Sequence, residues 1–187
     1  MKGERRILTP RLWLMDLHEE FNEAREYIRT KYFFPQPGRA STFETIIRHL
    51  GGFITIYELS GDPLFLDKAV DVALKFLPAF HAQSSSVPNP LLNVGTGQGS
   101  TRGAGTSFAE MSSFQLEFLA LAKHTGNMMW AVIAARVNQL LEVQVENRGH
   151  IYREFNIAGT SFSGSKYSAS ETTYLPVRYG IYRIGSR

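Results

Sequence analysis

Cysteine is absent from the 187 residues, and long apolar runs are absent as well. Without cysteine the chain holds no disulfide framework, no thiolate metal site and no cysteine nucleophile. No apolar stretch approaches the length that a helix needs to cross a bilayer, and no apolar segment follows the charged residues 1–6. We therefore expect any membrane anchor or targeting segment to lie outside this chain.

The chain also has little excess of positive over negative charge. The 20 Lys and Arg residues against 17 Asp and Glu give a net charge of +3, and the basic residues are scattered along the chain. A nucleic-acid partner is not expected, because such proteins gather their basic residues on one face. Hydrophobic residues make up 43% of the chain, which suffices for a packed core. We expect one domain over residues 1–187.

Helical periodicity is the main pattern that is present. Apolar residues recur at steps of three and four, which is typical of amphipathic helices with one buried face. Turn sequences at residues 60–63 and 125–127 each join two such stretches into an αα-hairpin. The periodic stretches are residues 14–28, 43–57, 65–76, 108–121 and 130–141. Between the hairpins, residues 81–106 predict a long loop.

The two hairpins form an internal repeat. Five residues of the first recur 65 positions later in the second: Gly61, Asp62, Phe65, Ala69 and Val72 match Gly126, Asn127, Trp130, Ala134 and Val137. Repeated hairpins must stack on neighbours, as a solenoid or a closed α/α toroid. We expect an all-α fold, a partial α/α toroid with helical hairpins over residues 12–146. An irregular tail over residues 147–187 follows, in which residues 151–187 are compatible with a strand, a loop or a disrupted tail.

Two groups of glycines are explained by the fold without a bound ligand. Gly51 and Gly52 lie inside a predicted helix, which favours tight helix packing at that point. The glycine-rich residues 95–99 look like a phosphate-binding loop, but no lysine follows in the required position, so a flexible loop is favoured. The histidines show no metal-ligand spacing, and no metal ligand is predicted within the chain.

The repeat also places a carboxylate in the first turn of each hairpin. Glu44 lies 17 residues before Gly61, and Glu110 lies 16 before Gly126. Spacing alone slightly favours a plain role, since an acid near a helix N-terminus complements the helix dipole. If the first helices line a toroid, however, these acids and Arg48 converge at one end of its cavity. Carboxylates around a cavity are suited to glycoside hydrolysis.

A series of short motifs follows one another along the chain from residue 12 to about residue 141. The longest is TFETIIRHLGG at residues 42–52; the others are residues 12–15, 20–25, 57–62, 77–80, 87–88, 93–97, 108–110, 114–118 and 125–127. Together they closely resemble glycoside hydrolase family 47, the class I α-1,2-mannosidases, and most of all its endoplasmic-reticulum branch. The resemblance implies a toroid of seven hairpins. It also implies inverting removal of α-1,2-linked mannose from high-mannose N-glycans of glycoproteins in the early secretory pathway, with calcium at the base of the cavity.

The resemblance assigns roles residue by residue. Glu44 matches the family's acid, Arg48 the arginine that orients it, and Glu110 a carboxylate that contacts sugar, while Arg102 lies near an arginine of the family's loop. The second catalytic carboxylate has its nearest counterpart at Glu171, although Pro176 interrupts the helix expected there. The calcium-binding threonine and the family's base are expected outside this chain. We therefore expect the 187-residue chain to be truncated and weakly active or inactive.

Two other functions are compatible with the sequence. A non-catalytic protein of glycoprotein quality control could use the same cavity wall to bind glycans. A truncated product without a stable function would instead unfold with poor cooperativity, because open toroid edges expose apolar helix faces.

Overall fold

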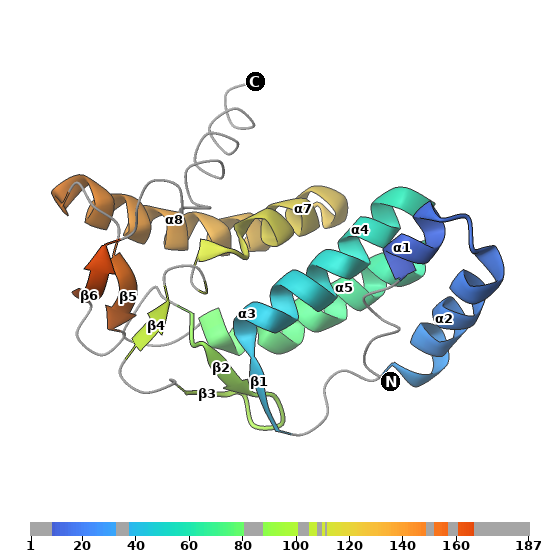
Figure 1. Cartoon of the computed structure of the whole chain (residues 1–187), viewed down its shortest axis with the longest axis horizontal. Helices are drawn as coiled ribbons and strands as arrows, with labels where there is room; N and C mark the ends of the chain where they lie inside the picture. The colour runs from blue at the N-terminus through green and yellow to red at the C-terminus, as the bar shows by residue number, and fades with distance from the viewer. Residues whose placement is uncertain are drawn as a thin grey trace.

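The computed structural model describes residues 9–32, 38–80, 88–100, 105–107, 110, 112–148, 152–156 and 161–166. Two helical hairpins form its centre and lie side by side (Figure 1). The first consists of α3 (Thr42–Thr45), η2 (Ile46–Leu50), α4 (Gly51–Ser60) and α5 (Pro63–Phe76). The second consists of α7 (Gln115–Thr125) and α8 (Met129–Arg148). Both predicted hairpins are present, although α7 begins at Gln115, later than the periodicity from residue 108 predicts.

Both hairpins turn with the same glycine geometry. Gly61 has φ 71° and donates its N–H to the carbonyl of Tyr57 at 2.8 Å. Gly126 has φ 70° and donates to the carbonyl of Ala122 at 2.9 Å. Only glycine adopts this left-handed conformation without steric cost, which is why it ends both helices.

The residue after each glycine caps the next helix. Asp62 accepts the N–H of Leu64 on Oδ1 at 3.0 Å, and Asn127 accepts the N–H of Met129 on Oδ1, also at 3.0 Å. Both side chains thereby satisfy a backbone donor that the first turn of a helix leaves without a partner. The repeat seen in the sequence is therefore a repeat of hydrogen bonds.

The repeat continues into the core as two pairs of stacked aromatic rings. Phe53 stacks on Phe65 with ring centroids 6.5 Å apart, and Phe118 stacks on Trp130 at 5.7 Å. All four side chains are fully buried. Each hairpin thus closes over its own aromatic pair.

The first hairpin contains a π-turn, η2, between Glu44 and its turn at Gly61. The helix that follows Glu44 widens into a π-helix at η2, closed by a hydrogen bond from the N–H of Gly51 to the carbonyl of Ile46. A π-turn takes one more residue than an α-turn. It lies between Glu44 and Gly61, where the first hairpin is one residue longer than the second.

Two N-terminal helices pack on the first hairpin, α1 (Thr9–Leu14) and α2 (His18–Lys31). The prediction of one helix over residues 14–28 was wrong at its start: Leu14 ends α1 and is 70% exposed. Phe21 and Ile28 are buried in α2, as predicted.

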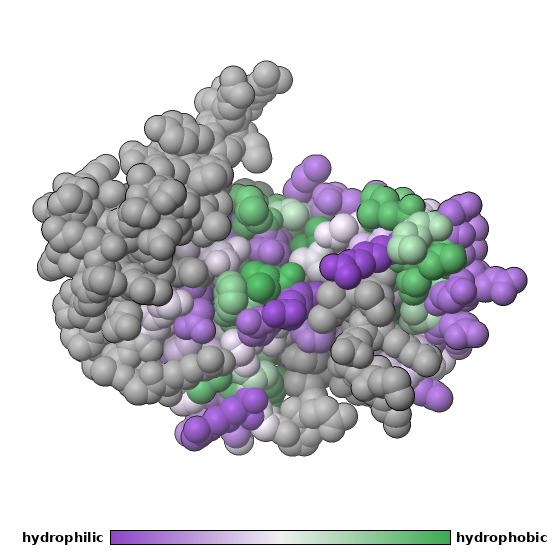
Figure 2. Space-filling model, viewed as in Figure 1, coloured by the Kyte–Doolittle hydropathy of each residue, from purple (hydrophilic) through white to green (hydrophobic). Residues whose placement is uncertain are grey.

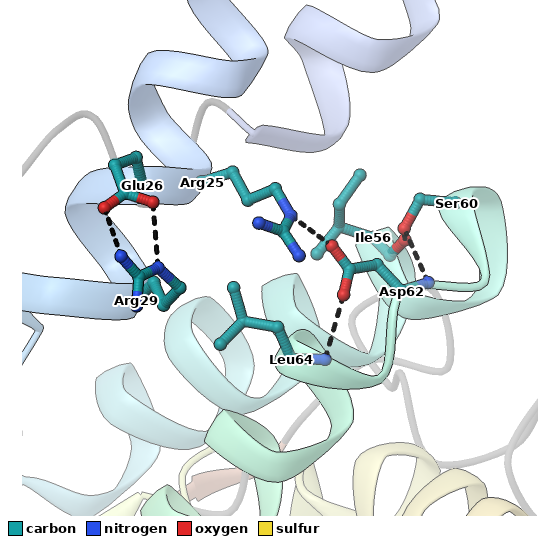
Figure 3. Close-up of polar contacts among 7 residues, drawn as sticks. All are labelled: Arg25, Glu26, Arg29, Ile56, Ser60, Asp62 and Leu64. Atoms are coloured by element: carbon teal, nitrogen blue, oxygen red, sulfur yellow. Dashed lines mark hydrogen bonds and ion pairs between the residues drawn. The ribbon is translucent and has the colours of Figure 1, made fainter.

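An ion pair ties α2 to the first hairpin turn. The guanidinium of Arg25 donates to the carboxylate of Asp62, the residue that caps α5 (Figure 3). Arg25 lowers the pKa of Asp62, and the N–H of Leu64 lowers it further, while desolvation opposes both. The turn is therefore anchored to a helix 37 residues away in the sequence.

Two short strands occupy parts of the loop predicted over residues 81–106, and they form one sheet with a strand that precedes α3. β1 (Arg39–Ser41), β2 (Leu91–Asn93) and β3 (Gln98–Ser100) form an antiparallel sheet in that order, and Arg39 pairs with Asn93. A 3-10 turn, η3 (Leu77–Phe80), follows α5.

A second antiparallel sheet differs from the predicted irregular tail. It contains β4 (Gly105–Ser107), β5 (Tyr152–Asn156) and β6 (Ser161–Lys166), in that order. Two of these strands lie within residues 147–187, and α8 itself reaches Arg148. Hydrogen bonding between segments far apart in the sequence, which no local pattern reveals, pairs β4 with β5.

Some large apolar side chains reach the surface. Met15, Leu116, Met128 and Val132 are each at least half exposed. Figure 2 shows apolar surface interspersed with polar residues, including a group over the region of α1. No helix in the described part of the chain is both long and apolar enough to traverse a lipid bilayer.

Candidate active site

Glu44 lies in the first turn of the first hairpin, directly after strand β1. Its N–H donates to the hydroxyl of Ser41, which caps the helix, at 3.3 Å. Its carboxylate is paired with the guanidinium of Arg48, one turn further along and inside the π-turn. The two side chains are 46% and 54% exposed, so a ligand in solution can reach the pair.

Glu110 occupies the matching position of the repeat, but it precedes Gln115, the first residue of α7. Its N–H donates to the hydroxyl of Ser107 at 3.2 Å, and its Oε2 accepts the N–H of Ser107 at 3.3 Å. This reciprocal arrangement is a capping box. The hydroxyl of Thr106 adds a third hydrogen bond to Oε2, at 3.1 Å.

The start of α3 is fixed by the segment that leads into strand β2. The N–H of Thr42 donates to the carbonyl of Pro90 at 3.0 Å, and its hydroxyl donates to the carbonyl of Asn89 at 2.6 Å. A Cβ at Gly99 would lie 2.1 Å from Nδ2 of Asn89, so a side chain there would displace Asn89. These contacts set where Glu44 lies, and only the Asn-Pro sequence hinted at them.

The glycine-rich residues 95–99 form the turn between β2 and β3. The amides of Gly95 and Thr96 both donate to Oδ1 of Asn93, at 3.1 and 3.3 Å. Amides that are already bonded inside a turn are not presented to a phosphate. The interpretation as an ordinary loop rather than a phosphate site is supported, although part of the segment is strand.

Comparison with known proteins shows which family this sequence belongs to. The sequence profile of glycosyl hydrolase family 47 matches residues 10–174, most of the chain. The chain belongs to glycosyl hydrolase family 47. Its membership confirms the resemblance carried by the motifs around Glu44.

Two curated relatives of this family 47 chain are mannosidases by name. It is 38% identical over 182 residues to mannosyl-oligosaccharide 1,2-alpha-mannosidase MNS1 of Arabidopsis thaliana, covering 94% of the chain and 32% of the relative. It is 37% identical over 130 residues to the human endoplasmic reticulum mannosyl-oligosaccharide 1,2-alpha-mannosidase, covering 68% of the chain and 18% of the relative. The chain thus spans only 18% to 32% of the lengths of these two relatives.

A solved structure of an alpha-1,2-mannosidase from Trichoderma reesei shares the fold. The TM-score is 0.70 at 24% identity, over 86% of the chain and 36% of that protein. The predicted partial α/α toroid is confirmed by this match.

The structure brings together some of the predicted site residues of the family 47 chain. Glu44 and Arg48 are in direct contact. Within the described part of the chain, no hydrogen bond or ion pair links Glu110 to either of them. Arg102 and Glu171 lie outside the described residues, so their predicted roles stay predictions.

Calcium finds no set of ligands in the described part of this family 47 chain. No group of three His, Asp or Glu side chains is placed there to hold a metal ion. The described residues therefore do not form a calcium site by themselves.

Two polar residues near the start of α7 were missed by sequence reasoning. Gln115 is fully buried, and neither its Oε1 nor its Nε2 has a hydrogen-bond partner among the described residues. Oε2 of Glu117 is likewise buried and without a partner in that part of the chain. Burial raises the pKa of Glu117, while its own backbone N–H opposes the rise. Their positions on a helix otherwise rich in apolar residues were the signal that could have revealed them.

Proposed function

We propose that this chain supplies the general acid of an inverting α-1,2-mannosidase that acts on high-mannose N-glycans of glycoproteins. The observation that supports this most is the contact between the exposed carboxylate of Glu44 and Arg48, within the motif that carries the family resemblance. Relatives named for the endoplasmic reticulum support action in the early secretory pathway. In the family as a whole, calcium would contact the sugar, with its protein ligand outside this chain.

Glu44 is proposed as the acid that protonates the departing glycosidic oxygen, directly or through water. A general acid must be held in one orientation relative to the bond that breaks. The guanidinium of Arg48 provides this, because its planar donor group fixes the carboxylate that it contacts. Half-exposed side chains leave room for a sugar to approach the pair.

Glu110 and Arg102 are proposed to bind sugar rather than to move protons. Oε2 of Glu110 already accepts hydrogen bonds from Thr106 and Ser107, which orients the carboxylate. A fixed acceptor of this kind suits a sugar hydroxyl. Arg102 would contribute donors from the neighbouring loop.

An inverting reaction needs a second carboxyl group, roughly 6.5 to 9.5 Å from the first, to activate water. The family's base is expected outside this chain, and Glu171 is the nearest substitute that the sequence offers within it. We propose that the 187-residue chain, assayed alone, binds mannosides and turns them over slowly or not at all.

The test measures both binding and release of mannose by the 187-residue chain, with a high-mannose N-glycan as substrate. We expect binding that weakens in Arg48→Ala, and little release. Slow release that both Glu44→Gln and Glu171→Gln abolish would support Glu171 as the second carboxyl group. Rapid release that Glu171→Gln leaves unchanged would overturn that assignment and the proposed weak turnover. Absence of both binding and release would overturn the proposed function.

A non-catalytic glycan-binding function is the second candidate. The observation that favours it is the hydrogen bonding of Glu110, which fixes that carboxylate as an acceptor. It predicts binding that Glu44→Gln leaves intact and no release of mannose under any condition.

A further inference from the structure

The π-turn that carries Arg48 ends at a glycine with an acidic neighbour from the second hairpin. A Cβ placed on Gly51 would lie 3.3 Å from Oε1 of Glu117 and 3.4 Å from its Cγ. Both distances are at or below the limit of ordinary contact between carbon and a neighbouring heavy atom. The side chain of Glu117 therefore packs directly on the backbone of Gly51.

Gly51 is also the residue that closes the π-turn. Its N–H donates to the carbonyl of Ile46, and that same carbonyl oxygen borders the space beside Gly51, 3.7 Å from the position of a Cβ. Any shift of Gly51 therefore changes the hydrogen bond that defines the turn. Arg48 lies inside this turn and contacts Glu44.

The carboxyl group of Glu117 is buried at this contact. Its Oε2 atom is shielded from water without a hydrogen-bond partner among the described residues, a cost that the rest of the fold must offset to keep the side chain there. Burial also raises the pKa of Glu117, because desolvation disfavours the charged carboxylate. An amide has nearly the same shape as this carboxyl group.

We propose that Glu117 is a positioning residue: by packing its carboxyl group on Gly51, it fixes the π-turn that holds Arg48 against Glu44. The importance of this contact for catalysis rests on the proposed function, but the contact itself does not. Among the described residues no hydrogen bond or ion pair joins Glu117 to either member of the pair, and in this proposal Glu117 acts through Gly51.

Two neighbouring glycines provide matched variants. Gly51→Ala inserts a methyl group against Glu117, whereas nothing lies within 4 Å of a Cβ on Gly52. Both substitutions gain the same helix propensity, about 1 kcal/mol relative to glycine. A difference between Gly51→Ala and Gly52→Ala therefore reports the surroundings of Gly51, in which the atoms of Glu117 are the nearest.

The experiment follows the Arg48 Nε–H resonance by NMR in the ¹⁵N-labelled chain, assigned by its loss in Arg48→Lys. We expect Gly51→Ala and Glu117→Ala to shift this resonance and to raise its exchange with solvent about tenfold, as a local opening of the turn would. Glu117→Gln should keep the wild-type signal, and so should Gly52→Ala. Thermal unfolding of each variant shows that it is folded.

The outcomes separate this proposal from the proposed function. An unchanged Arg48 signal in folded Glu117→Ala and Gly51→Ala would overturn the positioning role, whatever the glycan assays show. If Glu117→Ala does not fold, the comparison of Gly51→Ala with Gly52→Ala decides, and equal signals overturn the proposal. A shifted signal in a chain that neither binds nor cleaves mannosides would support the positioning role while the proposed function fails.

Discussion

The first and second hairpins share a serine cap, a glycine turn and a stacked aromatic pair. They differ in what the glutamate three residues after the capping serine does with its carboxylate. In the second, Glu110 returns its carboxylate to Ser107 and completes the box. In the first, Ser41 still caps the helix, while the carboxylate of Glu44 pairs with Arg48.

Sequence explains the difference. The places in the second hairpin that match Arg48 hold Ser113 and Phe114, neither of which offers a cation. In the first hairpin Arg48 lies four residues after Glu44, inside the π-turn, and pairs with its carboxylate. One local motif thus serves the fold in the second hairpin and presents an acid to solvent in the first.

The largest expected effect tests whether the two hairpins are equivalent in the core. Phe65→Ala and Trp130→Ala each remove a fully buried ring from a stacked pair, and each should lower the free energy of unfolding by about 3 to 5 kcal/mol. Urea unfolding followed by circular dichroism measures this. A loss below about 1 kcal/mol in one variant alone would show that the hairpins do not share one cooperative core.

The next effect compares the two capping residues, Asp62 and Asn127. Asp62→Asn keeps an acceptor for Leu64 but loses the charge that faces Arg25, and should cost about 0.5 to 1 kcal/mol at neutral pH because the pair is partly exposed and screened. Asn127→Asp should change stability by only a few tenths of a kcal/mol, since both residues cap equally well.

The pH dependence follows from the lowered pKa of Asp62. Its contribution is complete above the unfolded value of 3.8 and is lost as pH falls through the lower pKa of the folded state. The gap between wild type and Asp62→Asn in urea unfolding should therefore close at about pH 2. A gap that is unchanged by acid would rule out the ion pair as its source.

The smallest effect is the difference in stability between removing the carboxylate of Glu110 and removing that of Glu44. Glu110→Ala opens the capping box and should cost about 1 kcal/mol. Glu44→Ala removes only an exposed pair within one helix and should cost about 0.3 to 0.5 kcal/mol. Thermal unfolding of both variants measures the difference; a larger loss from Glu44→Ala would mean that its carboxylate mainly serves the fold.

Local features of the fold could be predicted from sequence. Glycine at positive φ and Asp or Asn at a helix start act within a few residues, so the turns at Gly61 and Gly126 were visible as patterns. Periodicity likewise identified the buried faces that contain Phe118 and Trp130.

Contacts between distant segments could not be predicted in this way. Glu117 meets Gly51 across 66 positions, and Arg25 meets Asp62 across 37. The strands β5 and β6 are specified by their partners more than by their own residues, which include glycine and serine. The extra residue after Glu44 was visible as a count, but only the structure identified it as a π-turn.

Binding of α-1,2-linked mannobiose to the 187-residue chain tests most directly whether Glu44 and Arg48 form a mannoside site. Calorimetry would compare wild type with Glu44→Gln and Arg48→Ala, with Glu19→Gln as an exposed carboxylate control on α2. We predict that Glu19→Gln binds as wild type does, and that loss of either member of the pair weakens binding about tenfold or more, as expected for a charged hydrogen bond to a ligand. Equal affinity in all four proteins, or no binding to wild type, would contradict the assignment of this pair to the sugar.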